Sequence, residues 1–204
     1  MSIIKYKSYW KKYNFVVKSN KKAPIKTENM EKSRKMNIQQ IEIERKYIIA
    51  KPEIKALQSA ENFTQSEIVQ IYLASDEGVT HRVRSRSAEG RVLYTETIKR
   101  RIDKMSCDER EREISEEEFA FLSKKIAEGT RPIIKKRYTF EFCGQIFEID
   151  VYPEWDKTAI METELESREQ TVGMPEFITI VREVTGDKAY SNASMSRRFP
   201  KEEF

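Results

Sequence analysis

The sequence is poor in the residues that build disulfide frameworks and zinc sites. Its 204 residues include only two cysteines, Cys107 and Cys143, and a single histidine, His81. Two cysteines support no disulfide framework, and a reducing cytoplasm is the simplest setting for such a chain. The histidine has no cysteine or second histidine near it, which argues against a zinc site.

Long apolar runs are also missing from the sequence. No stretch approaches the ~20 residues that a membrane-spanning helix requires, so we expect no membrane span. Charged residues, by contrast, make up 35% of the chain, well above the usual quarter or so. Tyrosine and phenylalanine are plentiful as well, with nine and ten copies. This composition indicates a folded, charge-rich β protein rather than a disordered chain.

The charge is unevenly distributed along the chain. Residues 1–37 carry eleven Lys or Arg residues against two Glu, a balance of +9, which leaves −5 for the remainder of a chain whose net charge is +4. Such a split predicts a boundary near Met36, between a basic, poorly ordered extension (1–36) and one domain (37–204). The extension mixes Lys with Tyr and Trp and could touch nucleic acid or lipid. A solvated extension is the simpler interpretation, and we expect a monomer or homodimer without a nucleic-acid partner.

Beyond Met36, runs rich in β-branched and aromatic residues alternate with short turns. They predict eight strands, which cover residues 41–49, 67–75, 80–87, 92–102, 108–114, 133–142, 146–153 and 159–167. A short helix is expected over 52–60 and longer ones over 115–129 and 174–186. Ser115 and Glu118 form a capping box for the second of these helices. Because short turns dominate the connections, the sheet should be mostly antiparallel.

Alternation along the predicted strands places charged side chains on one shared face. The first strand carries Glu42, Glu44 and Lys46 on one side, and apolar residues occupy the opposite faces of most strands. The remaining charged positions are Arg82, Arg84, Lys99, Glu111, Glu113, Lys135, Arg137, Asp150, Glu162 and Glu164. Either the sheet is flat with its charges in solvent, or it closes into a barrel with a charged lumen. About eight strands can enclose one small ligand.

The two signs of charge point to a polyanion bound together with a divalent cation. The bases would collect phosphate oxygens, and the arginine fork can bind two of them at once. Neighbouring carboxylates would repel both one another and the polyanion unless a cation lay between them. Mg²⁺ and Mn²⁺ prefer such oxygen ligands. A polyphosphate with Mg²⁺ or Mn²⁺ therefore reconciles both sets of residues.

These motifs resemble the CYTH domain, the family also called triphosphate tunnel metalloenzymes. The first strand has the E-x-E-x-K signature as Glu42, Glu44 and Lys46, and ordered motifs follow along the chain. They are "RVR" at 82–84, "TIK" ending at Lys99, "EREREI" ending at Ile114, "KKRY" at 135–138, "IDVY" with Asp150, and "METELES" with Glu162 and Glu164. The segment "EVTGDKAYSNASM", 183–195, resembles the end of bacterial members. The resemblance runs from about Ile38 to Met195.

The resemblance implies an eight-stranded antiparallel tunnel with helices outside, which hydrolyses inorganic tripolyphosphate, a nucleoside triphosphate or thiamine triphosphate. It implies that the metal ligands are Asp150, Glu162 and Glu164, with Glu111 and Glu113 nearby. Glu42 and Glu44 would bind a second metal or orient the attacking water, and with Lys46 they are the expected catalytic residues. The phosphate cradle would comprise Lys46, Arg82, Arg84, Lys99, Lys135 and Arg137. Glu109, Glu148 and Glu166 could equally form salt bridges at the rim.

Two other functions stay open at the level of sequence. A class IV-type adenylyl cyclase would share the fold and make cyclic AMP from ATP, but no adenine pocket can be recognised in the sequence. A non-catalytic polyphosphate or nucleotide binder is the second alternative. Such a binder would not need several strands with paired carboxylates, because added negative charge weakens the binding of a polyanion. The acidic residues therefore favour the metal-dependent triphosphatase.

Overall fold

The computed structural model describes residues 40–102 and 106–203, and for 40–42, 101, 106 and 107 it describes the backbone only. These residues belong to one compact unit, Ile38–Phe204. The predicted basic extension lies outside the described residues, so its boundary and its role stay predictions.

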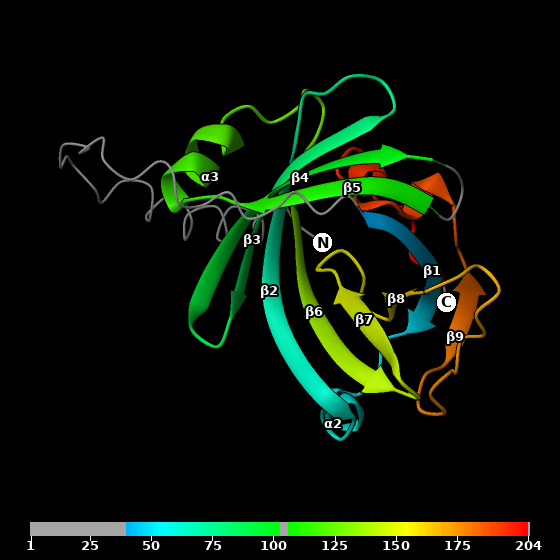
Figure 1. The fold of residues 1–204 in the computed structure, drawn as a ribbon. Coiled ribbons are helices and arrows are strands. Elements are labelled where there is room, and N and C mark those ends of the chain that lie inside the picture. The colour runs from blue at the N-terminus through cyan, green and yellow to red at the C-terminus, as the bar shows by residue number, and fades with distance from the viewer. Residues whose placement is uncertain (1–39, 103–105, 204) are drawn as a thin grey trace. The chain divides into compact units, whose positions relative to one another are not determined.

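Nine strands form one antiparallel sheet in the described residues (Figure 1). They are β1 (Gln40–Ala50), β2 (Glu61–Leu73), β3 (Val79–Ala88), β4 (Arg91–Arg101), β5 (Ser106–Glu113), β6 (Ile133–Phe142), β7 (Gln145–Val151), β8 (Thr158–Glu164) and β9 (Ile180–Glu183). The helices are short: α2 (Ile54–Gln58), α3 (Glu116–Ser123), the 3₁₀ turn η1 (Lys188–Tyr190) and α4 (Asn192–Met195). None of the helices described is long and apolar enough to cross a membrane.

The order of the strands closes the sheet. It runs β5-β4-β3-β2-β6-β7-β8-β1, and the first residues of β1 pair again with β5, with Gln40 opposite Glu109 and Ile43 opposite Ser106. The ninth strand, β9, pairs with the later part of β1. The closed, eight-stranded antiparallel architecture, one of the two arrangements that alternation left open and the one that the CYTH resemblance implies, is therefore confirmed, with β9 added to it.

The helix predicted over 174–186 is wrong. Residues Ile180–Glu183 form β9, of which Ile180, Arg182 and Glu183 pair with β1 between Tyr47 and Ile49, with a register shift at Val181. Its first two residues are the β-branched pair Ile180 and Val181, which lose side-chain freedom in a helix and fit a strand better. The helix predicted over 115–129 is real but shorter, since α3 ends at Ser123. Its cap is the predicted one, because Ser115 Oγ accepts a hydrogen bond from the Glu118 amide at 3.1 Å.

Two apolar clusters cover the outer face of the sheet. The first includes Tyr47, Phe140, Phe147 and Met161 and packs under Leu57 of α2. The second includes Ile71, Leu73, Val83 and Ile114 and packs against the partly buried Phe119 and Leu122 of α3. The apolar residues predicted to lie opposite the charges thus bury the outer face of the sheet, and the charged face is the inner one.

A third apolar cluster lies on the inner face, at one end of the ring. Strand alternation puts Ile48 on the same side as Lys46, and Ile160 on the same side as Glu162. Both pack with Tyr190 of η1 and Met195 of α4, together with Tyr72, Ile133, Tyr152, Trp155 and Val184. The C-terminal helical turns therefore fill one end of the interior, and the charged residues occupy the rest.

Candidate functional site

The inner face encloses one cavity of about 620 Å³ in the described residues. Residues from β1 to β8 line it, and Ser191, Asn192 and Ala193 contribute from the C-terminal turns. Ten of the predicted site residues line this cavity: Glu44, Lys46, Arg82, Arg84, Lys99, Glu111, Lys135, Arg137, Glu162 and Glu164. The shared face inferred from strand parity thus corresponds to one interior surface.

Two predicted residues, Asp150 and Glu113, are placed differently, and the placement of a third, Glu42, stays a prediction. Asp150 is fully buried behind the cavity wall and is absent from the cavity lining. Glu113 is exposed and also lies outside the lining, opposite Thr95 of β4. Glu42 pairs with Cys107 through the backbone, and its side chain lies outside the described part of the chain. Parity gives the face of a strand but not the depth along it, which explains the first two differences.

The acidic wall of the cavity centres on Lys46. Its Nζ lies 2.9 Å from Glu162 Oε1 and 3.2 Å from Glu44 Oε1. Burial alone lowers the pKa of Lys46, but the charges of Glu162 and Glu44 outweigh it and hold the pKa above its ordinary value. Burial likewise raises the pKa of Glu162, and Lys46 and Arg137 outweigh it, so that the pKa lies below its usual range. Both side chains are therefore charged at neutral pH.

Arg137 and Lys135 on β6 share the buried carboxylate of Asp150. Arg137 donates from Nε to Oδ1 and from Nη2 to Oδ2, both at 2.7 Å, and Lys135 Nζ lies 2.5 Å from Oδ2. Arg137 also contacts Glu148 and Glu162. Burial, and then the charge of Arg137, lower the pKa of Lys135 to about 8, although Asp150 acts in the opposite direction.

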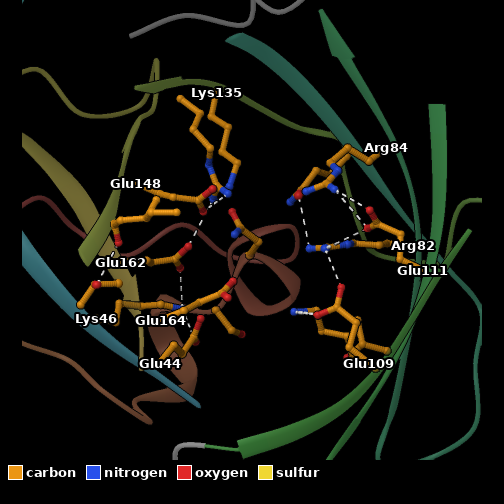
Figure 2. A pocket seen from close by; sticks show the side chains of 18 of the residues that line it. Glu44, Lys46, Arg82, Arg84, Glu109, Glu111, Lys135, Glu148, Glu162 and Glu164 are labelled. Carbon is orange, nitrogen blue, oxygen red and sulfur yellow. Dashed lines mark hydrogen bonds and ion pairs between the residues drawn. The ribbon is translucent and has the colours of Figure 1, made fainter. Parts of the chain in front are cut away.

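The opposite wall is built from the arginines of β3 (Figure 2). Arg84 Nη2 donates to both carboxylate oxygens of Glu111, at 3.1 and 3.0 Å. Arg82 Nη2 lies 3.5 Å from Glu109 Oε1, and Lys99 pairs with the same glutamate. Burial and the neighbouring charge of Arg82 lower the pKa of Arg84. Three basic side chains, Arg82, Arg84 and Lys99, thus lie close together on this wall of the cavity, and they favour an anionic ligand.

Several cavity residues were left unassigned by sequence reasoning. For Glu109 and Glu148 the sequence did not decide between a salt bridge at the rim and metal binding. The structure places both side chains in the cavity lining. Gln70 and Tyr72 of β2 also line the cavity, and Gln70 is 1% exposed with no hydrogen-bond partner for Nε2 in the described residues. The sequence did contain a signal for them: Ser66, Gln70 and Tyr72 are polar or aromatic residues of the same parity along β2, which places them on one face of that strand.

The donor chemistry of the acidic wall fits a hard divalent cation. Glu44 of β1 lies directly opposite Glu164 of β8, and Glu162 follows on the same face. Like charges opposite one another destabilise a sheet, and a cation between them removes that cost. Among the described residues no three acidic, histidine or cysteine side chains are already gathered around one point as a metal site. Glu44 pairs instead with Lys46, and Glu162 pairs with both Lys46 and Arg137.

Comparisons with known proteins agree with this geometry. The family model of the CYTH domain matches residues 40–199. The crystal structure of the inorganic triphosphatase NE1496 is similar, with 27% identity, a TM-score of 0.52, and coverage of 78% of this chain and 96% of that one. PH1819 from Pyrococcus horikoshii OT3 is 22% identical with a TM-score of 0.48, covering 62% of this chain and 80% of that one.

HpAC1 from Hippeastrum, an adenylyl cyclase candidate with a dominant triphosphatase activity, is 15% identical with a TM-score of 0.44, covering 63% of this chain and 81% of that one. A search of curated protein sequences found no significant match. The family match spans the whole described ring, from β1 to the residues after α4. The chain therefore belongs to the CYTH domain family.

Proposed function

We propose that the protein hydrolyses a triphosphate inside this cavity, with a divalent cation, Mg²⁺ or Mn²⁺, held by the acidic wall. The observation that carries the proposal is the facing of the two walls (Figure 2): one is rich in carboxylates of β1, β7 and β8, and the other carries the arginines of β3, which pair with glutamates of β5. The likeness to an inorganic triphosphatase over 96% of that chain supports it. A binding module would gain nothing from the carboxylates, which weaken the binding of an anion.

Inorganic tripolyphosphate is the substrate that the lining supports best. Among the described lining residues Tyr72 is the only aromatic one, and it is 7% exposed within the inner apolar cluster. A nucleobase is usually held by stacking on an aromatic ring, and the described lining offers none that is exposed. The same observation gives the adenylyl cyclase alternative less support.

Each group of residues has a distinct part in the proposed reaction. Arg82, Arg84 and Lys99 exchange their carboxylate partners for phosphate oxygens. Lys135 and Arg137 stay paired with Asp150 and direct their remaining donors to the chain of phosphates. Glu44, Glu162 and Glu164 hold the cation, which when bound neutralises phosphate charge and lowers the pKa of a water molecule. Positioning and charge neutralisation carry most of the catalysis of phosphoryl transfer.

We assign Asp150 a different part from direct metal binding. Both of its oxygens are already occupied by Arg137 and Lys135, and the side chain is 1% exposed. Removing it from these partners would leave the buried ammonium group of Lys135 without its carboxylate partner and take one of three carboxylates from Arg137, which is costly. Asp150 therefore orients the two bases of β6 toward the phosphates.

The test separates hydrolysis from binding. Glu162→Gln and Glu44→Gln should each lower kcat for tripolyphosphate by about a hundredfold or more, because an amide is a poor ligand for a hard cation. In EDTA the same variants should bind tripolyphosphate at least as tightly as the wild type, since a repelling carboxylate is gone. The control is Glu67→Gln, on the outer face of β2 and 48% exposed. If the cavity variants retain wild-type kcat, these glutamates do not serve the reaction.

A further inference from the structure

Arg86 differs from the other cations of the cavity in its partners. It lines the cavity as the third arginine on the inner face of β3, after Arg82 and Arg84. Arg82 pairs with Glu109 and Arg84 with Glu111. In the described part of the chain Arg86 has no carboxylate within ion-pair distance, and its Nε donates to the neutral hydroxyl of Ser66 at 3.1 Å. The structure thus holds an uncompensated guanidinium group against the cavity.

The position of Arg86 along β3 is set by the register with β2. Arg82 lies opposite Tyr72, Arg84 opposite Gln70 and Arg86 opposite Ile68. Tyr72 belongs to the apolar cluster that fills the closed end of the interior. The three arginines therefore lead away from that end, with about 6.6 Å between successive side chains on the same face. Arg86 is the one farthest from the apolar cluster.

Ser66 gives this position a built geometry rather than a loose surface charge. Ser66 is 4% exposed and lies opposite Arg137 in the pairing of β2 with β6. Its hydroxyl fixes the Nε side of the Arg86 guanidinium, so that the two Nη groups remain for a ligand. A guanidinium held in this way offers a planar pair of donors, which matches phosphate oxygens.

We propose that Arg86, oriented by Ser66, is an additional phosphate subsite that lets the cavity hold a linear polyphosphate longer than three phosphates. The inference rests on the proposed function, because it assumes that Arg82 and Arg84 hold the first phosphates of the chain. Because one step along β3 exceeds the spacing between adjacent phosphates, a triphosphate that spans Arg82 and Arg84 ends near Arg84, and at least one further phosphate is needed to extend toward the guanidinium group of Arg86. Arg86 therefore determines specificity for chain length.

The experiment compares the binding of tripolyphosphate and tetrapolyphosphate to the full chain by calorimetry in EDTA. Wild-type protein should bind tetrapolyphosphate about tenfold more tightly, as expected for one added pair of charge-assisted hydrogen bonds. Arg86→Gln should remove most of this ratio, with a smaller change in tripolyphosphate affinity. Arg86→Lys should retain part of it, because the charge remains while the planar fork is lost.

The matched control is Arg100→Gln, which removes one positive charge from an exposed position of β4 outside the cavity. It should leave the ratio of the two affinities unchanged. Ser66→Ala provides a second variant that leaves the charge in place, and it should lower the ratio in the same direction by a smaller factor. Thermal melting of each variant verifies that it is folded.

A wild-type ratio near one would overturn the inference, as would an Arg86→Gln variant that weakens both ligands equally. In those cases tripolyphosphate would still be hydrolysed, so the proposed function would stand. Failure of the proposed function has a different signature, since the wild type would then release no phosphate from tripolyphosphate in Mg²⁺ or Mn²⁺.

Discussion

At the scale of single residues, the contacts of Lys135 show how the interior tolerates buried charge. Lys135 is 2% exposed, and its ammonium group shares the Asp150 carboxylate with Arg137. Burial disfavours the ammonium form, and Arg137 repels it. The consequence is a lysine that can lose its proton only slightly above neutral pH, whereas the neighbouring carboxylates hold the pKa values of Lys46 and Arg137 above their ordinary values.

We expect Lys135 to titrate near pH 8 in the wild type and lower in Asp150→Asn, because the amide no longer attracts the ammonium group. Between pH 8 and its ordinary value of 10.5 the unfolded chain binds more protons than the folded one. The contribution of Lys135 to the free energy of unfolding should therefore increase as pH rises through that window, which makes the folded protein more stable. NMR of ¹³C-labelled lysine measures the titration, and Lys135→Arg identifies the resonance. A wild-type titration near 10.5 would contradict this account.

At the scale of elements, the C-terminal segment is part of the fold. The Phe199 ring lies 5.3 Å from that of Tyr152 and 5.2 Å from that of Trp155, measured between centroids. Trp155 Nε1 donates to the Pro200 carbonyl, and Glu202 accepts from the amides of Lys157 and Thr158. These contacts hold the segment beyond α4 against the start of β8 and support the apolar end of the interior.

Phe199→Ala should lower the free energy of unfolding by about 2 kcal/mol, because Phe199 is partly buried and its removal leaves space beside two aromatic rings. Phe121→Ala is the control, since Phe121 on α3 is 58% exposed and its loss should cost about 0.5 kcal/mol or less. Urea unfolding followed by fluorescence measures both changes. Equal losses in the two variants would mean that the C-terminal segment does not support the ring.

At the scale of the whole molecule, alternation predicts one charged face shared by the strands, and the CYTH resemblance is needed to predict that the sheet closes around it. The period of two assigns each side chain to a face, and burial of unpaired charge in an ordinary core is too costly. Alternation does not give depth, so it could not separate Asp150, behind the wall, from Glu162 in the lining. It also could not show that Ile48 and Ile160 meet η1 and α4 inside the ring, because that contact joins distant parts of the chain.

The short strand β9 marks another limit of local sequence reasoning. Its residues fit a helix pattern that ends at Gly186, yet they pair with the edge of β1 beyond the part of β1 that meets β5. The ring leaves this edge open, and backbone groups at an open edge favour a further strand. Pairing with β1 thus overrides the helical pattern of residues 174–186. The partner strand lies far away in the sequence, so a local window cannot reveal this pairing.

The central claim is that the two-walled cavity hydrolyses triphosphates with a divalent cation, and phosphate release from tripolyphosphate by the purified full chain tests it most directly. The assay is run with Mg²⁺, with Mn²⁺ and with excess EDTA, beside calorimetric binding of the same ligand. We predict turnover with at least one cation and none in EDTA. Tight binding of tripolyphosphate without release of phosphate or pyrophosphate under any of these conditions would contradict the claim and identify a binding module instead.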